Sequence, residues 1–96
     1  MEIDLHGFEL WDAIDEILYK LEECKIKGER ELLLVHGYKS GQVLKNYLRS
    51  KRFLTEMAQE GYNLKMKEIL NSGMTSFEIF YKKSNIRWYN VKNSEL

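Results

Sequence analysis

The stretch Glu31-Leu32-Leu33-Leu34-Val35-His36-Gly37 decides the fold. An aliphatic run this short, ended by a glycine, is typical of a strand that is buried on both faces. Upstream, residues 1–5 alternate apolar and acidic side chains and predict a first strand. Between the two strands, apolar residues recur at helical spacing from Phe8 to about Ile26, and Gly28 follows as a helix stop. Strand, helix and strand make a βαβ unit, so we expect two parallel strands with a right-handed crossover.

Downstream of this unit, the pattern predicts a second helix and a hairpin. The helix follows the loop 37–41, with Ser40 as a candidate N-cap, and either continues or restarts before Gly61. Residues 62–70 and the run after the turn at 71–73 alternate in the manner of paired strands. The predicted order is β-α-β-α-β-β, an α/β sandwich with a mixed four-stranded sheet and two main helices.

Composition sets the class of protein. The 96 residues suffice for one domain, and 44% hydrophobic with 31% charged residues fits an ordinary folded domain. The longest aliphatic run is far shorter than the ~20 residues of a membrane span, and the N-terminal residues do not read as a signal peptide. The single cysteine, Cys24, excludes an intramolecular disulfide, and we expect it to be buried. Phe8, Trp11 and Phe77 are also expected in the core, and the cytoplasm is the expected location.

The zero net charge hides an uneven distribution. Residues 1–31 carry ten acids and four bases, whereas residues 32–96 carry five acids and eleven bases. Lys45, Arg49 and Arg52 follow one another at spacings of four and three, which would place them on one face of a single helix. Such a stripe is either a solvated helix face or a contact for nucleic-acid phosphates.

Both histidines of the chain are expected at one edge of the sheet. His6 follows the first strand and His36 ends the second, and parallel neighbouring strands bring their carboxyl ends together, where ligands bind. Asp4 and the loop 37–41 arrive at the same edge. Histidine titrates near neutral pH and can act as general acid or base, so Asp4, His6 and His36 are the candidate catalytic residues. Whether the Asp4 carboxylate contacts His6 stays open at this point.

These residues resemble the signatures of the Smr (small MutS-related) domain family. Ile3-Asp4-Leu5-His6-Gly7 is similar to the family's Leu-Asp-Leu-His-Gly. His36-Gly37-Tyr38-Lys39-Ser40-Gly41 is similar to its His-Gly-x-Gly-x-Gly, with Lys39 in place of the central glycine. A third glycine-rich turn keeps only Gly73 in register. Residues 1–83 are therefore interpreted as an Smr-like domain. Residues 84–96 are interpreted as a C-terminal extension, with an edge strand or a surface-docked segment and then a frayed tail.

The resemblance implies a fold similar to the C-terminal domain of translation initiation factor three and a domain that binds nucleic acid. In many members of the family it is a nuclease. The leading hypothesis is an endonuclease on RNA, with DNA less favoured, that cleaves phosphodiesters through histidine without a metal or other cofactor. The alternative is a non-catalytic RNA- or DNA-binding adaptor that associates with the ribosome. Contacts to nucleic acid are expected from these residues: Gly37, Tyr38, Lys39, Ser40, Gly41, Lys45, Arg49 and Arg52. No membrane partner is expected.

Overall fold

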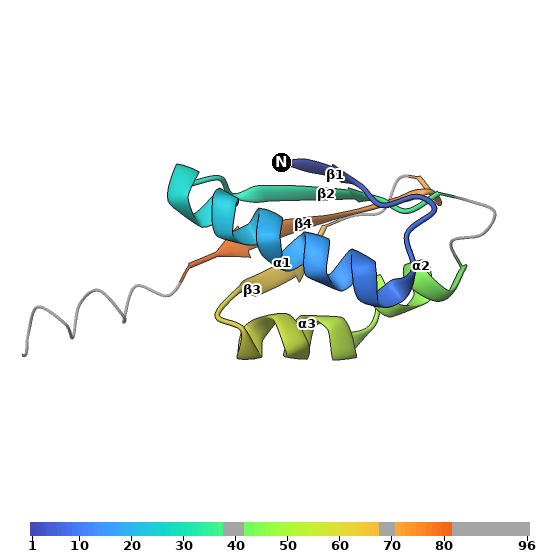
Figure 1. Ribbon diagram of the computed structural model, residues 1–96. Coiled ribbons are helices and arrows are strands. Elements are labelled where there is room, and N and C mark those ends of the chain that lie inside the picture. Colours follow the sequence, from blue (N-terminus) through green and yellow to red (C-terminus); the bar gives the residue numbers. More distant parts are fainter. Residues whose placement is uncertain (38–41, 68–70, 82–96) are drawn as a thin grey trace, which may run out of the picture.

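The computed structural model describes residues 1–37, 42–67 and 71–81, and these form a four-stranded mixed sheet with three helices. The sheet order is β1-β2-β4-β3 (Figure 1), with β1 parallel to β2 and β4 antiparallel to both of its neighbours. The predicted α/β sandwich is therefore confirmed. The elements are β1 (Glu2–Asp4), α1 (Leu10–Lys27), β2 (Glu31–Val35), α2 (Gln42–Leu48), α3 (Lys51–Gln59), β3 (Asn63–Met66) and β4 (Met74–Phe80).

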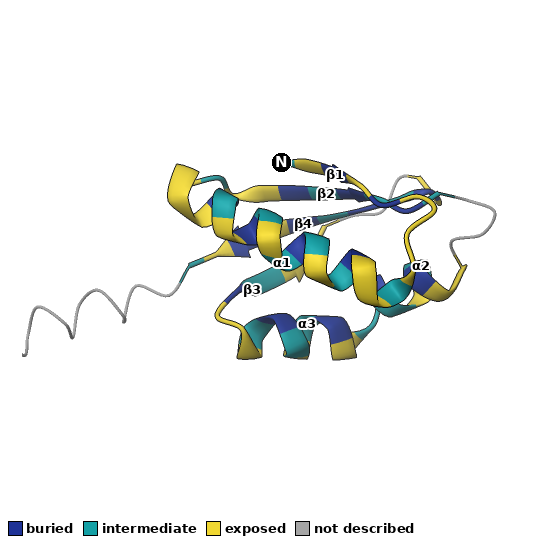
Figure 2. Ribbon diagram, viewed as in Figure 1, coloured by how far each residue is buried: buried dark blue, intermediate teal, exposed yellow. Residues whose placement is uncertain are grey.

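The core lies between the sheet and the helices, which cover one of its faces (Figures 1 and 2). Helix α1 turns a stripe of buried residues toward the sheet, and Gly28 ends it in a left-handed conformation with φ of 74°. Cys24 belongs to this stripe and is fully buried, as predicted. None of the helices in residues 1–37, 42–67 and 71–81 combines the length and hydropathy needed to cross a membrane. The buried stripe of α1 consists of Ala13, Ile17, Leu21 and Cys24.

Two of the aromatic residues predicted in the core are exposed instead. Trp11 is 72% exposed and Phe8 is 40% exposed, whereas Phe77 is fully buried as predicted. Trp11 precedes Ala13, a member of the buried stripe, by two residues. Two residues correspond to about 200° of rotation around a helix, so Trp11 lies on the side of α1 turned away from the stripe. The prediction counted hydrophobicity and neglected helical phase.

The second helix restarts rather than continues. Ser50 has an extended backbone, with φ of −97° and ψ of 162°, and its hydroxyl accepts a hydrogen bond from the Phe53 N–H at 3.3 Å. This N-cap begins α3 as a new helix after α2 has ended at Leu48. The expectation that Lys45, Arg49 and Arg52 share one face of a single helix is therefore wrong.

Candidate active site at the strand ends

Asp4 and His6 form a hydrogen-bonded pair where β1 ends. The Nδ1 atom of His6 lies 2.9 Å from Oδ1 of Asp4, and the His6 backbone N–H donates to the same oxygen at 3.1 Å. Both side chains face solvent, at 72% exposed for His6 and 63% for Asp4. Because a carboxylate accepts hydrogen bonds, Nδ1 carries the proton, and Nε2 is left as the atom that can take up another. The sequence alone did not decide whether Asp4 contacts His6, and the structure shows that it does.

Local sequence explains why the pair forms. An aspartate that accepts from the backbone N–H two residues on makes an Asx turn, and this turn brings the His6 ring within hydrogen-bonding distance of the carboxylate. Leu5, between them, is fully buried, and its N–H donates to the Val35 carbonyl at 2.7 Å. The hydrogen bonds from His6 lower the pKa of Asp4 below its ordinary value, so this carboxyl is ionised at neutral pH.

His36 reaches the same edge of the sheet but lies in different surroundings. The residue is 1% exposed, with Nε2 2.9 Å from the Thr75 hydroxyl oxygen and Nδ1 3.2 Å from the Gly37 carbonyl oxygen. Burial lowers the pKa of His36, and the nearby charges of Arg49 and Lys45 lower it further, against the opposing effect of the Gly37 carbonyl. The ring is therefore neutral at pH 7.

Gly37 connects the two motifs. Its φ of 86° lies in the left-handed region that favours glycine, and a Cβ placed on it would lie 3.5 Å from the Cβ of His6. Its N–H and that of His36 both donate to the Gly73 carbonyl, at 3.0 and 2.9 Å. Gly37 therefore lies beside His6, as the parallel strand ends predict.

The basic residues predicted as phosphate contacts divide into different environments. The Arg49 guanidinium donates to the Thr75 hydroxyl and the Met74 carbonyl, each at 2.9 Å, and to the Asn71 carbonyl at 3.2 Å. Arg52, on α3, pairs with Glu56 at 3.0 Å. Lys45, on α2, is half-buried and close enough to His36 to affect its pKa. Tyr38, Lys39, Ser40 and Gly41 lie outside the described residues.

Thr75 is a site residue that sequence reasoning missed. It is 2% exposed and its backbone pairs with Leu34 in the adjacent strand β2. The alternation of β4 points Thr75 inward together with Phe77 and Ile79, both of which are buried. A polar residue at an inward strand position needs a hydrogen-bonding partner, and this was the available signal.

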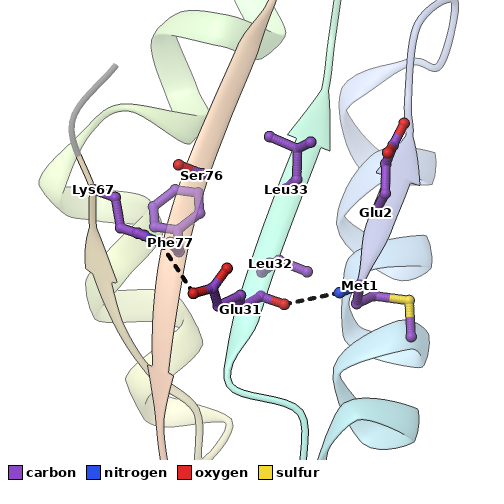
Figure 3. Close-up of a pocket in the computed structure, with 8 residues that line it drawn as sticks. All are labelled: Met1, Glu2, Glu31, Leu32, Leu33, Lys67, Ser76 and Phe77. Atoms are coloured by element: carbon purple, nitrogen blue, oxygen red, sulfur yellow. Dashed lines mark hydrogen bonds and ion pairs between the residues drawn. The ribbon is translucent and has the colours of Figure 1, made fainter. Parts of the chain in front are cut away.

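A separate hollow of about 310 Å³ lies on the face of the sheet away from the helices (Figure 3). The Lys67 ammonium and the Glu31 carboxylate pair across it at 3.2 Å. Glu31 begins β2, whereas His36 follows its end, and five residues of strand span about 17 Å. The hollow is therefore distinct from the candidate active site. It is lined by Met1, Glu2, Glu31, Leu32, Leu33, Lys67, Ser76 and Phe77.

The fold and the site together define an α/β domain with an exposed Asp–His pair beside a glycine turn at parallel strand ends. The family model of the Smr domain matches residues 3–60, and the chain belongs to this family. The crystal structure of the Smr domain of Thermus thermophilus MutS2 has a similar fold. Its TM-score is 0.65 at 23% identity, over 82% of this chain and 96% of that one.

A curated relative provides a functional comparison. Endonuclease MutS2 of Finegoldia magna is 32% identical over 65 residues. The match includes 65% of this chain and spans 8% of the length of that much longer protein. The comparison therefore concerns one domain of the relative.

Proposed function

We propose that this domain binds nucleic acid, RNA in preference to DNA, and cleaves its phosphodiester backbone. The observation that carries the proposal is the 2.9 Å contact between the Asp4 carboxylate and His6, on side chains that are both open to solvent. Membership of the Smr family and the similarity to a protein named an endonuclease support the same reaction class. In this proposal His6 is the catalytic base and Asp4 orients it.

The geometry of the pair suits proton transfer. Asp4 holds the proton on Nδ1 of His6, so the Nε2 lone pair points away from the carboxylate and can accept a proton from the RNA 2′-hydroxyl. The 2′ oxygen then attacks the neighbouring phosphorus, the bond to the 5′ oxygen breaks, and solvent protonates that leaving oxygen. The products are a 2′,3′-cyclic phosphate and a 5′-hydroxyl. The ionised Asp4 stabilises the imidazolium that forms on His6.

Binding is proposed to rest on the positive charge that follows the second strand. Arg49 and Arg52 already donate to protein oxygens, so their charges are partly engaged within the domain. Lys45 lies near His36, and its positive charge contributes to the lowered pKa of that ring. The Lys45 ammonium can attract a phosphate toward the edge of the sheet where His6 lies.

A binding adaptor is the second candidate. Lys39 stands where the family motif has its central glycine, and that change adds a cation while it removes backbone freedom. An adaptor of this kind would use the same edge of the sheet for affinity and would cut nothing.

The deciding experiment incubates the 96-residue chain with end-labelled single-stranded RNA and with DNA of the same sequence, with and without EDTA. We expect the wild type to cut the RNA with or without EDTA, and His6→Ala to cut it about 10²–10⁴-fold more slowly. If neither nucleic acid is cut while the RNA is bound, the adaptor is correct. If cutting stops on chelation, the metal-free reaction is wrong.

A further inference from the structure

A continuous hydrogen-bonded chain runs from Arg49 through Thr75 and His36 to Gly37. Arg49 Nε lies 2.9 Å from the Thr75 hydroxyl oxygen, that oxygen lies 2.9 Å from His36 Nε2, and His36 Nδ1 lies 3.2 Å from the Gly37 carbonyl oxygen. The chain joins residues that are 26 and 39 positions apart in the sequence. Three of its members come from different parts of the fold: the end of α2, the start of β4 and the end of β2.

The direction of every bond follows from the chemistry of its ends. A guanidinium can only donate and a carbonyl can only accept. The Thr75 hydroxyl therefore accepts from Arg49, and the proton on the His36 ring lies at Nδ1, facing the Gly37 carbonyl. The hydroxyl hydrogen of Thr75 then remains for the lone pair of His36 Nε2. One neutral tautomer satisfies all of these bonds at once.

Protonation of His36 would break this arrangement. A second ring proton at Nε2 would face the Thr75 oxygen, which would then accept two bonds and turn its own hydrogen away in a site that is 2% exposed. The charged groups on α2 and at its end, Lys45 and Arg49, also repel an imidazolium. On the other side, beyond Gly37, lie Asp4 and His6, whose opposite charges are paired with each other when His6 is protonated.

The same hydrogen bonds also hold Gly37 in place. Arg49 also donates to the carbonyls of Asn71 and Met74, and the Gly73 carbonyl between them accepts from the backbone of His36 and Gly37. The turn at 71–74 is thereby hydrogen-bonded both to Arg49 and to the backbone of His36 and Gly37. Gly37 lies against His6, where the proposed base acts.

We infer that His36, Thr75 and Arg49 form a positioning unit, in which His36 stays neutral with its proton on Nδ1 and places Gly37 against His6. The inference deepens the proposed function and, for its effect on cleavage, rests on it. His36, predicted from the sequence as catalytic, then transfers no proton, and Arg49, predicted as a phosphate contact, acts through Thr75.

The test records the imidazole nitrogens of the uniformly ¹⁵N-labelled 96-residue chain by long-range ¹H–¹⁵N NMR between about pH 5 and 8. We expect His36 to show the Nδ1–H tautomer throughout this range. Thr75→Val, which keeps the shape and removes the hydroxyl, should yield a mixture of His36 tautomers. Thr75→Ser should restore the wild-type pattern, and Thr55→Val, the same change at an exposed position of α3, should leave it unaltered.

A second variant keeps the test decisive if Thr75→Val does not fold. Arg49→Lys preserves the charge but not the fork of donors, so we expect an altered His36 tautomer and a tenfold or greater loss in kcat with little change in RNA affinity. A wild-type His36 that is Nε2–H, or that takes up a second ring proton between about pH 5 and 8, overturns the inference. So does an Arg49→Lys variant that loses affinity and keeps the tautomer. The NMR arm needs no cleavage, so an inactive wild type would contradict the proposed function alone.

Discussion

The two histidines of the chain lie at one edge of the sheet, yet His6 is 72% exposed on its side chain and His36 is 1% exposed as a residue. His6 donates to the Asp4 carboxylate, and the ring of His36 lies between a hydroxyl and a carbonyl. A ring that faces solvent beside a carboxylate is accessible to a substrate, whereas a ring buried among neutral partners and near cations holds one protonation state. This difference divides the proposed roles of base and positioning residue.

Asp4→Asn should reduce cleavage without weakening RNA binding. The amide keeps the size of the side chain but removes the charge that is proposed to stabilise the His6 imidazolium. It also removes a negative charge from the face proposed to bind phosphate. We expect single-turnover cleavage to fall by about tenfold or more, and Kd to stay equal or decrease. Wild-type turnover in Asp4→Asn would show that the 2.9 Å contact has no part in catalysis.

His36 should make the free energy of unfolding depend on pH. Its pKa is lowered in the folded protein, so the unfolded chain binds the extra proton and stability falls as the pH drops below the unfolded value of about 6.5. Urea titrations at pH 7.5 and 5.5 should therefore show lower stability at the acid pH, by at most about 1.4 kcal/mol per pH unit. His36→Gln, which cannot titrate, should flatten this dependence.

Gly37→Ala should affect both stability and cleavage. At a φ of 86° an alanine is strained by about 1–2 kcal/mol, and its Cβ would contact His6 at 3.5 Å. Gly28→Ala provides the matched control, because its φ of 74° carries a similar strain and nothing lies within 4 Å of the added carbon. Equal losses of stability with cleavage lowered in Gly37→Ala alone would support the contact. Equal cleavage in the two variants would argue against it.

Lys45→Gln should weaken RNA binding through lost counterion release. One phosphate contact on single-stranded nucleic acid contributes about 0.7 to the slope of log K against log salt, so we expect the slope to decrease by roughly that amount. Arg52→Gln should change it less, because Arg52 already pairs with Glu56. Lys25→Gln, near the C-terminal end of α1, serves as the control. Fluorescence anisotropy over a range of salt concentrations measures all of these slopes.

Much of the fold follows from local patterns in the sequence. The aliphatic run at 31–35 and the alternation at 1–5 lead to two parallel strands, and parallel strands bring His6 and His36 to one edge. Each of these steps uses either the periodicity of apolar residues or the rule for how consecutive parallel strands are connected. The Asp4 contact is local as well, but its geometry depends on an Asx turn that alternation alone does not reveal.

The network around His36 could not be predicted in this way. Arg49 and Thr75 are 26 residues apart in the sequence. A count of charges along the sequence does not reveal that the Arg49 guanidinium donates to a backbone carbonyl such as that of Met74. The predicted stripe of Lys45, Arg49 and Arg52 requires one unbroken helix. Ser50 instead acts as an N-cap and begins a new helix between Arg49 and Arg52. Long-range hydrogen bonds and helix caps determine these two features, and neither produces a periodic pattern in the sequence.

The most direct test of the central claim compares wild type and His6→Ala on an RNA oligonucleotide and on the same oligonucleotide with one deoxynucleotide at the scissile position. Removal of a general base costs about 10²–10⁴-fold, so His6→Ala should cut the RNA more slowly by that factor while it binds with nearly unchanged affinity. The wild type should leave the deoxy position uncut, because the attacking 2′-hydroxyl is absent there. Full-rate cutting at the deoxy position would contradict the proposed nucleophile, and an undiminished rate in His6→Ala would contradict the assignment of the Asp4–His6 pair.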